Sequence, residues 1–151
     1  AMNLNQEMFA VKICELEQQY ELMQSRLQIC RKENHEEIRR ELARLLAEYR
    51  EAQELMEHRK KNSRSPGAAA LSGICLDYFR QADAIADREL PGYLHSGFSD
   101  GMQDRADAQA LYAEYAIDVA VQSMRHAGIA VMRAMDAQMD CDEKRTEEPA
   151  E

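Results

Sequence analysis

A loop near residue 95 holds the residue types that nucleophilic catalysis uses. His95, Ser96 and Asp100 supply an imidazole, a hydroxyl and a carboxylate close together in the sequence, and these are the groups that activate a serine. The surrounding residues lack the strand-to-helix elbow that exposes such a serine, and side chains of neighbouring residues cannot easily face each other. We therefore expect no catalytic residue in this chain and interpret it as a protein that is not an enzyme.

The same loop carries aromatic residues beside residues that break helices. Tyr93 and Phe98 follow Pro91 and Gly92, and loops with apolar anchors commonly pack onto a protein core. We expect Tyr93 and Phe98 to pin the loop to the core while His95 stays in solvent. Tyr93, His95 and Phe98 are therefore our candidate loop contact residues.

Residues that bind metals are present, but their spacing does not match a known metal centre. A di-iron centre in a helical bundle needs Glu-x-x-His pairs, whereas Glu54 and His58 are four residues apart and His126 has no acidic residue three positions earlier. Soft ligands for Cu(I) gather near His126 and Cys141, namely Met124, Met132, Met135 and Met139. Helical methionines usually fill gaps between helices, so we expect core packing, no metal site and no bound cofactor.

The net charge of −9 is unevenly distributed along the chain. Residues 1–64 carry 12 acidic and 12 basic residues, and residues 65–151 carry 16 acidic and 7 basic ones. An acidic surface repels nucleic-acid phosphates, so we expect no direct nucleic-acid binding and consider a basic protein partner instead. The candidate acidic partner surface consists of Asp77, Asp83, Asp87, Asp104 and Asp107.

The composition predicts an all-α protein. Only 6 glycines and 3 prolines interrupt 151 residues, of which 31% are charged. The chain is rich in Ala, Leu, Glu, Gln, Arg and Met, which lose little side-chain freedom in a helix, and poor in β-branched residues. We expect long helices and no strand.

The N-terminal part shows the apolar spacing of coiled-coil helices. Steps of four and three residues connect Phe9, Ile13, Leu16, Tyr20, Met23, Leu27 and Cys30, and a second run contains Ile38, Leu42, Leu45, Tyr49, Ala52 and Met56. The spacing stutters between the two runs, where Asn34 and Glu37 form a capping box that would begin a new helix. We favour a coiled-coil-like helical hairpin. The alternative is one long helix whose apolar face is covered by a partner chain.

Two further helices are expected after a linker. Ser65 followed by Pro66 predicts a helix start, and the wide apolar stripe of this third helix indicates contacts with two neighbours. Ser99 is the expected N-cap of the last helix, which should run from about Asp100 to Asp140. Small residues recur along the last helix at Ala113, Ala116, Ala120, Ser123, Ala127, Ala130, Ala134 and Ala137.

These boundaries predict a bundle of about four helices. The hairpin or long helix occupies residues 1–62, the linker 63–67, the two further helices 68–140, and a disordered acidic tail 141–151. The last helix is apolar nearly all round and longer than the others, so three shorter helices would not cover it. We therefore expect a homodimer.

The sequence also suggests a compartment. The residues after Met2 are polar, and no apolar run approaches the roughly 20 residues that span a bilayer. The four cysteines are far apart and form no Cys-x-x-Cys pair, which favours reduced, buried thiols. We expect a cytoplasmic protein that does not insert into membranes.

Two functions fit these features. The first is a non-catalytic helical protein–protein interaction module, an adaptor or regulator. The alternative is an acidic inhibitor whose carboxylates mimic nucleic-acid phosphates and block a basic nucleic-acid-binding protein such as a nuclease.

Overall fold

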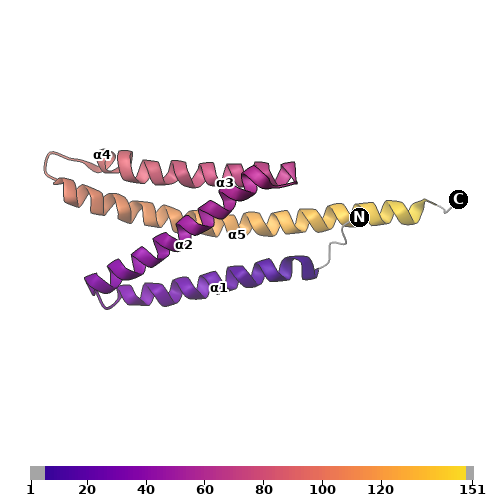
Figure 1. The fold of residues 1–151 in the computed structure, drawn as a ribbon, viewed down its shortest axis with the longest axis horizontal. Helices are drawn as coiled ribbons and strands as arrows, with labels where there is room; N and C mark the ends of the chain where they lie inside the picture. Colours follow the sequence, from indigo (N-terminus) through magenta and orange to yellow (C-terminus); the bar gives the residue numbers. More distant parts are fainter. Residues whose placement is uncertain (1–5, 149–151) are drawn as a thin grey trace. The chain divides into compact units, whose positions relative to one another are not determined.

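The computed structural model describes residues 6–148, and within this range every regular element is helical (Figure 1). The elements are α1 (Gln6–Cys30), α2 (His35–Asn62), α3 (Pro66–Ala84), the π-helical turn η1 (Ile85–Glu89), α4 (Leu90–Leu94) and α5 (Gly101–Glu147). The prediction of an all-α fold is confirmed.

The chain breaks between α1 and α2, so the alternative of one long N-terminal helix is wrong. Glu33 adopts a left-handed backbone conformation with φ of 50°, which an α-helix does not accommodate. The side chain of Asn34 then accepts a hydrogen bond from the N–H of Glu37 at 3.2 Å, the N-cap interaction of α2. The packing of α1 against α2 as a hairpin stays a prediction.

The start of α3 follows the predicted capping pattern. The Ser65 hydroxyl accepts a hydrogen bond from the N–H of Ala68 at 3.2 Å, and Pro66 occupies the first turn. Proline suits this position because its missing N–H would have no partner within the helix.

The third helical segment is longer than expected because it continues past Ile85 through a widened turn. The N–H of Leu90 donates to the carbonyl of Ile85, five residues earlier, which defines the π-helical turn. Pro91 follows directly, and in a regular α-helix its ring would clash with the carbonyl four residues before it. The helical segment ends at Leu94, so Pro91, Gly92 and Tyr93, which the sequence pattern assigned to a loop, belong to α4.

Both ends of α5 differ from the expectation. Asp100, rather than Ser99, supplies the N-cap: its carboxylate accepts a hydrogen bond from the N–H of Gln103 at 2.7 Å. The helix continues to Glu147, whereas the sequence pattern placed its end at Asp140 and a disordered tail after it. The charged segment forms helix because it contains neither glycine nor an internal proline before residue 149.

Residues 29–114 form one compact unit, in which three helical segments meet. α2 and α3 run antiparallel, because Tyr49 of α2 pairs with Asp83 of α3 while the later residue Glu57 pairs with the earlier residue Arg80. The buried side chains Leu76, Ala86, Asp104 and Ala108 come from α3, η1 and the first turns of α5. These elements supply the core of the described residues, and α2 packs along α3.

The other unit combines α1 with the part of α5 beyond residue 114. Large apolar side chains on both helices are exposed, including Ile13, Leu16 and Leu27 on α1 and Tyr115, Ile117, Met124 and Met132 on α5. These apolar side chains of α5 are therefore left uncovered within this unit, and the sequence pattern likewise predicted that three shorter helices would not cover the last helix. Homodimerisation stays a prediction.

The thiol groups are free, as expected, but they are not buried. Cys14, Cys30 and Cys141 are exposed, and Cys75 is half-buried. The expected burial among apolar neighbours is therefore wrong for Cys14, Cys30 and Cys141 and only partly met for Cys75.

Candidate functional site

A carboxylate connects the three helices of the 29–114 unit. Asp83 of α3 accepts a hydrogen bond from the Tyr49 hydroxyl of α2 at 3.0 Å and another from the Tyr112 hydroxyl of α5 at 3.1 Å. The two tyrosines bond different oxygens of the carboxylate, so each hydroxyl has its own acceptor. Hydrogen bonds to a charged acceptor are stronger than neutral ones, and this junction fixes the register of all three helices.

The surroundings of the junction keep both tyrosines protonated. Burial, together with the Asp83 carboxylate, raises the pKa of Tyr112 to about 12, and the same causes raise the pKa of Tyr49 far above its usual value. The ring of Tyr49 also packs edge-on against Phe79, with centroids 5.8 Å apart. A tyrosine held neutral in this way serves as a hydrogen-bond donor, which is a structural role.

An ion pair joins α2 and α3 near their connection. Arg80 contacts Glu57 at 3.0 Å, and Lys61 lies 3.6 Å from the other carboxylate oxygen. The hydrogen bond from Arg80 lowers the pKa of Glu57. Such exposed pairs contribute little stability, so this cluster orients the two helices more than it stabilises them.

His95 and Asp104 close the turn between α4 and α5. The Nδ1 atom of His95 lies 2.6 Å from Oδ2 of Asp104, whose side chain is buried at 4% exposure. Asp104 belongs to the first turn of α5, where the helix dipole favours a negative charge. The Ser99 hydroxyl and then the His95 imidazole lower the pKa of Asp104. The sequence grouping paired His95 with Asp100, but Asp100 caps α5 instead.

An imidazole backed by a buried carboxylate occurs in hydrolases, where a serine hydroxyl bonds the second ring nitrogen. Among the described residues, the hydrogen-bond partner of the His95 ring is Asp104. The hydroxyls of Ser96 and Ser99 bond to backbone groups of the loop instead. The arrangement therefore acts as a clasp on the loop.

The five predicted acidic residues do not share one accessible surface. Asp77, Asp87 and Asp107 are exposed. Asp83 is half-buried at the tyrosine junction and Asp104 is buried beside His95. Two of the five carboxylates are therefore occupied inside the unit, which sequence periodicity alone did not indicate.

The aromatic loop residues lie in solvent, which contradicts the expectation that they pin the loop. Tyr93 and Phe98 are both strongly exposed, and Phe98 is fully so. The loop is held by polar contacts instead: the pair of His95 with Asp104, and the hydroxyl of Ser99, which bonds backbone groups of Ser96. The physical reason is that a buried carboxylate without a hydrogen-bond partner costs more free energy than an aromatic ring that is exposed to solvent.

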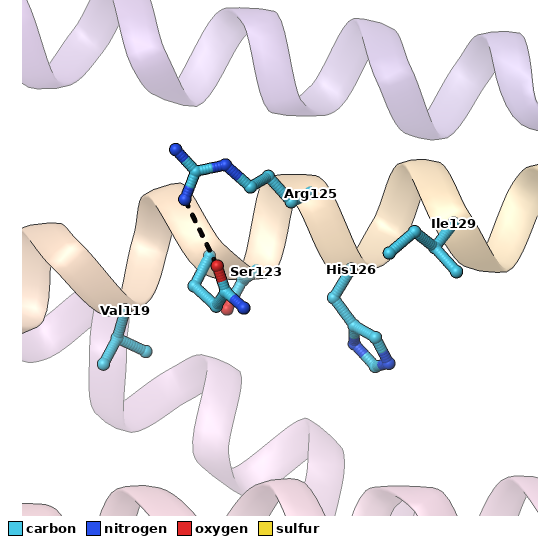
Figure 2. Close-up of a pocket in the computed structure, with 6 residues that line it drawn as sticks. Val119, Ser123, Arg125, His126 and Ile129 are labelled. Atoms are coloured by element: carbon cyan, nitrogen blue, oxygen red, sulfur yellow. Dashed lines mark hydrogen bonds between the residues drawn. The ribbon is translucent and has the colours of Figure 1, made fainter.

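Two shallow hollows lie on α5. The larger, about 480 Å³, is lined by one helical turn: Asp100, Gly101, Met102 and Arg105. The other, about 360 Å³, is lined by Val119, Gln122, Ser123, Arg125, His126 and Ile129 (Figure 2). Arg125 bonds Gln122 at 3.2 Å and extends to one side of the helix, while His126 extends to the other. These polar groups do not converge on a common ligand position.

Residues 6–148 contain neither a metal-binding cluster nor a helix that could cross a membrane. Within this range, no three His, Cys, Asp or Glu side chains gather closely enough to hold a metal ion. No helix of the same range is both long enough and apolar enough to cross a lipid bilayer.

The coiled-coil positions of α1 form a regular row of exposed apolar residues. Its coiled-coil positions Ile13, Leu16, Tyr20, Met23 and Leu27 are all exposed, although their spacing is that of a buried helix seam. We call the seven positions that the sequence pattern identified the α1 seam: Phe9, Ile13, Leu16, Tyr20, Met23, Leu27 and Cys30.

The comparisons with known proteins give no family for this chain, since no family model, curated protein or solved structure matches it.

Proposed function

We propose that this chain is a non-catalytic protein–protein interaction module that presents helix faces to other helices. The observation that carries the proposal is the α1 seam, a coiled-coil pattern that lies exposed on a helix of 25 residues. An apolar stripe at this spacing is stable in water when a second helix covers it.

The amount of exposed surface supports the proposal. On α1 alone, the exposed fractions of Ile13, Leu16, Tyr20, Met23 and Leu27 lie between 44% and 53%. Three apolar residues are buried among the described ones, namely Leu76, Ala86 and Ala108. Exposed apolar patches larger than those of ordinary monomers mark interaction sites.

Two kinds of helix can cover the α1 seam. One is α2 of the same chain, as in the hairpin that the sequence favours, and the other is a helix of another chain.

The alternative function, an acidic inhibitor, has weaker support because Asp83 and Asp104 are engaged inside the 29–114 unit.

Affinity capture with two matched variants tests the proposal. Ile13 belongs to the α1 seam, and Val11 lies on another face of the same helix; both are exposed, at 49% and 67%. Full-length chains carrying Ile13→Glu or Val11→Glu, and the parent chain, are used to capture partners from a lysate of the source, with washes at low and high salt.

We expect one set of bound proteins to survive the high-salt wash, to disappear with Ile13→Glu and to remain with Val11→Glu. Salt resistance is expected because apolar contacts, unlike exposed charge pairs, are not screened. Partners lost at high salt and insensitive to Ile13→Glu, but lost when Asp77, Asp87 and Asp107 are neutralised, would instead establish the acidic inhibitor.

A further inference from the structure

We propose that the α1 seam binds the α1 seam of a second copy, as a parallel, in-register, two-stranded coiled coil. This inference rests on the proposed function, since it names the partner of the same surface. It places two identical helices side by side about a twofold axis, so that each seam residue faces its own counterpart.

The heptad positions follow from the spacing. Steps of three lead from an a to a d position and steps of four from d to a, which places Ile13, Tyr20 and Leu27 at a, and Phe9, Leu16, Met23 and Cys30 at d. A β-branched residue at a with leucine at d, as in Ile13 and Leu16, favours two-stranded parallel coils.

Charges beside the seam select the parallel orientation. In a parallel pair, a g residue faces the e residue five positions later on the partner, so Lys12 faces Glu17 with opposite charge. In an antiparallel pair, g faces g and e faces e. Lys12 would then face Arg26, and Glu17 would face a second Glu17.

The other flanking positions leave this preference unchanged. Gln19 and Gln24, which face each other in the parallel pair, are neutral. Arg26 would face Arg31, but Arg31 lies in the turn after α1 ends, where the two chains can separate. Such flanking pairs set orientation and register more than affinity.

Cys30, the last position of the α1 seam, allows the parallel pairing to be tested by disulfide formation. Packed helix axes lie about 8–10 Å apart and each Cα lies about 2.3 Å from its own axis, so facing d positions bring their Cα atoms to roughly 3.5–5.5 Å. Most of that range suits a disulfide. In an antiparallel pair, Cys30 would face the start of α1, and the two Cys30 residues would be about 36 Å apart at 1.5 Å per residue.

Cys14 is the matched control that the chain itself provides. It lies on the same helix and is exposed like Cys30, but it follows Ile13 and so occupies position b, on the outer side of the coil. A comparison of the two thiols therefore isolates the effect of their position on the helix, because the reacting group is the same.

The experiment uses two full-length chains with one cysteine each. The first keeps Cys30 and carries Cys14→Ser, Cys75→Ser and Cys141→Ser; the second keeps Cys14 and carries the other three changes. Both are oxidised with glutathione disulfide at micromolar protein and separated by electrophoresis without reductant. Sedimentation of the reduced chains measures their mass, and far-UV circular dichroism confirms that each is folded.

We expect a dimer mass for both reduced chains, a disulfide-linked dimer for most of the Cys30 chain, and at least tenfold less for the Cys14 chain. A dimer mass without Cys30 cross-linking would overturn the parallel pairing while the interaction function stands. A monomer mass would overturn the self-association. If Ile13→Glu also left partner capture unchanged, the proposed function would fail with it.

Discussion

The two units of the chain differ in how their helices are held together. In residues 29–114, the buried residues Leu76, Ala86, Asp104 and Ala108 and the bonds of Asp83 to two tyrosines come from different helices, although other apolar residues of this unit, such as Leu71, are exposed. On α1 and on α5 beyond residue 114, most large apolar residues are exposed. The first unit therefore holds its own tertiary structure, whereas the second leaves the apolar faces of its helices exposed.

The largest effect should follow from removing the single large side chain that is fully buried. Leu76 is 0% exposed, and Leu71 of the same helix is 70% exposed. Leu76→Ala should lower the free energy of unfolding by about 2–5 kcal/mol, because it deletes buried contacts and leaves a cavity. Leu71→Ala should change it by less than about 0.5 kcal/mol. Urea unfolding measures both, and equal effects would show that the core of this unit lies elsewhere.

Loss of the tyrosine junction should have the next largest effect. Asp83→Ala removes the acceptor of two hydroxyls and should cost about 1–3 kcal/mol in urea unfolding, while Asp77→Ala, at an exposed position, serves as the control.

The ionisation of Tyr112 provides a spectroscopic test of the junction. Stability that comes from the raised pKa of Tyr112 is fully present below pH 10 and is lost as the pH rises toward about 12. Ultraviolet titration should show Tyr112 ionising nearer pH 10 in Asp83→Ala. An unchanged titration would mean that the carboxylate does not hold the ring.

Acid should weaken the clasp between His95 and Asp104. The pKa of Asp104 is lowered in the folded chain, so its contribution is present above the ordinary Asp pKa of about 3.9 and is lost as the pH falls through the lower, folded value. Between pH 5 and pH 2, the free energy of unfolding should fall less in Asp104→Asn than in the parent chain. Parallel pH profiles of the two chains would contradict the clasp.

The smallest effect tests the break between α1 and α2. Glu33 has a φ of 50°, which glycine adopts without strain. Glu33→Gly should therefore raise the free energy of unfolding by about 0.5 kcal/mol, whereas in a continuous helix the same change would lower it by about 1 kcal/mol. The sign of the change, measured by thermal unfolding, decides between the two.

Local features of the fold were predictable because they depend on neighbouring residues. The caps at Asn34 and Ser65 lie where the sequence placed them, since a capping side chain bonds a backbone N–H three residues later. The capped helix α3 begins at Pro66, inside the segment 63–67 that the sequence pattern assigned to a linker. Helix ends beside charged residues, such as Glu147, were harder because charge alone does not stop a helix.

The tertiary contacts were not predictable in the same way. Asp83 bonds residues 34 and 29 positions away in the sequence, and periodicity does not report such pairs. One signal was present: Asp83 follows Phe79 by four residues and Leu76 by seven, so it lies on the buried side of α3. Asp104 likewise precedes Ala108 and Tyr112 at steps of four. Carboxylates aligned with core positions indicate structural roles rather than a partner surface.

The π-helical turn at Ile85–Glu89 has an evolutionary consequence. Such a turn accommodates one more residue than the α-helical turn it replaces, so the residues that follow avoid the rotation of about 100° that an extra residue would cause in a regular α-helix. A chain derived from the same ancestor but with an unbroken α-helix here should be one residue shorter between Tyr78 and His95. A single-residue gap in this interval would then mark the insertion from which the turn arose.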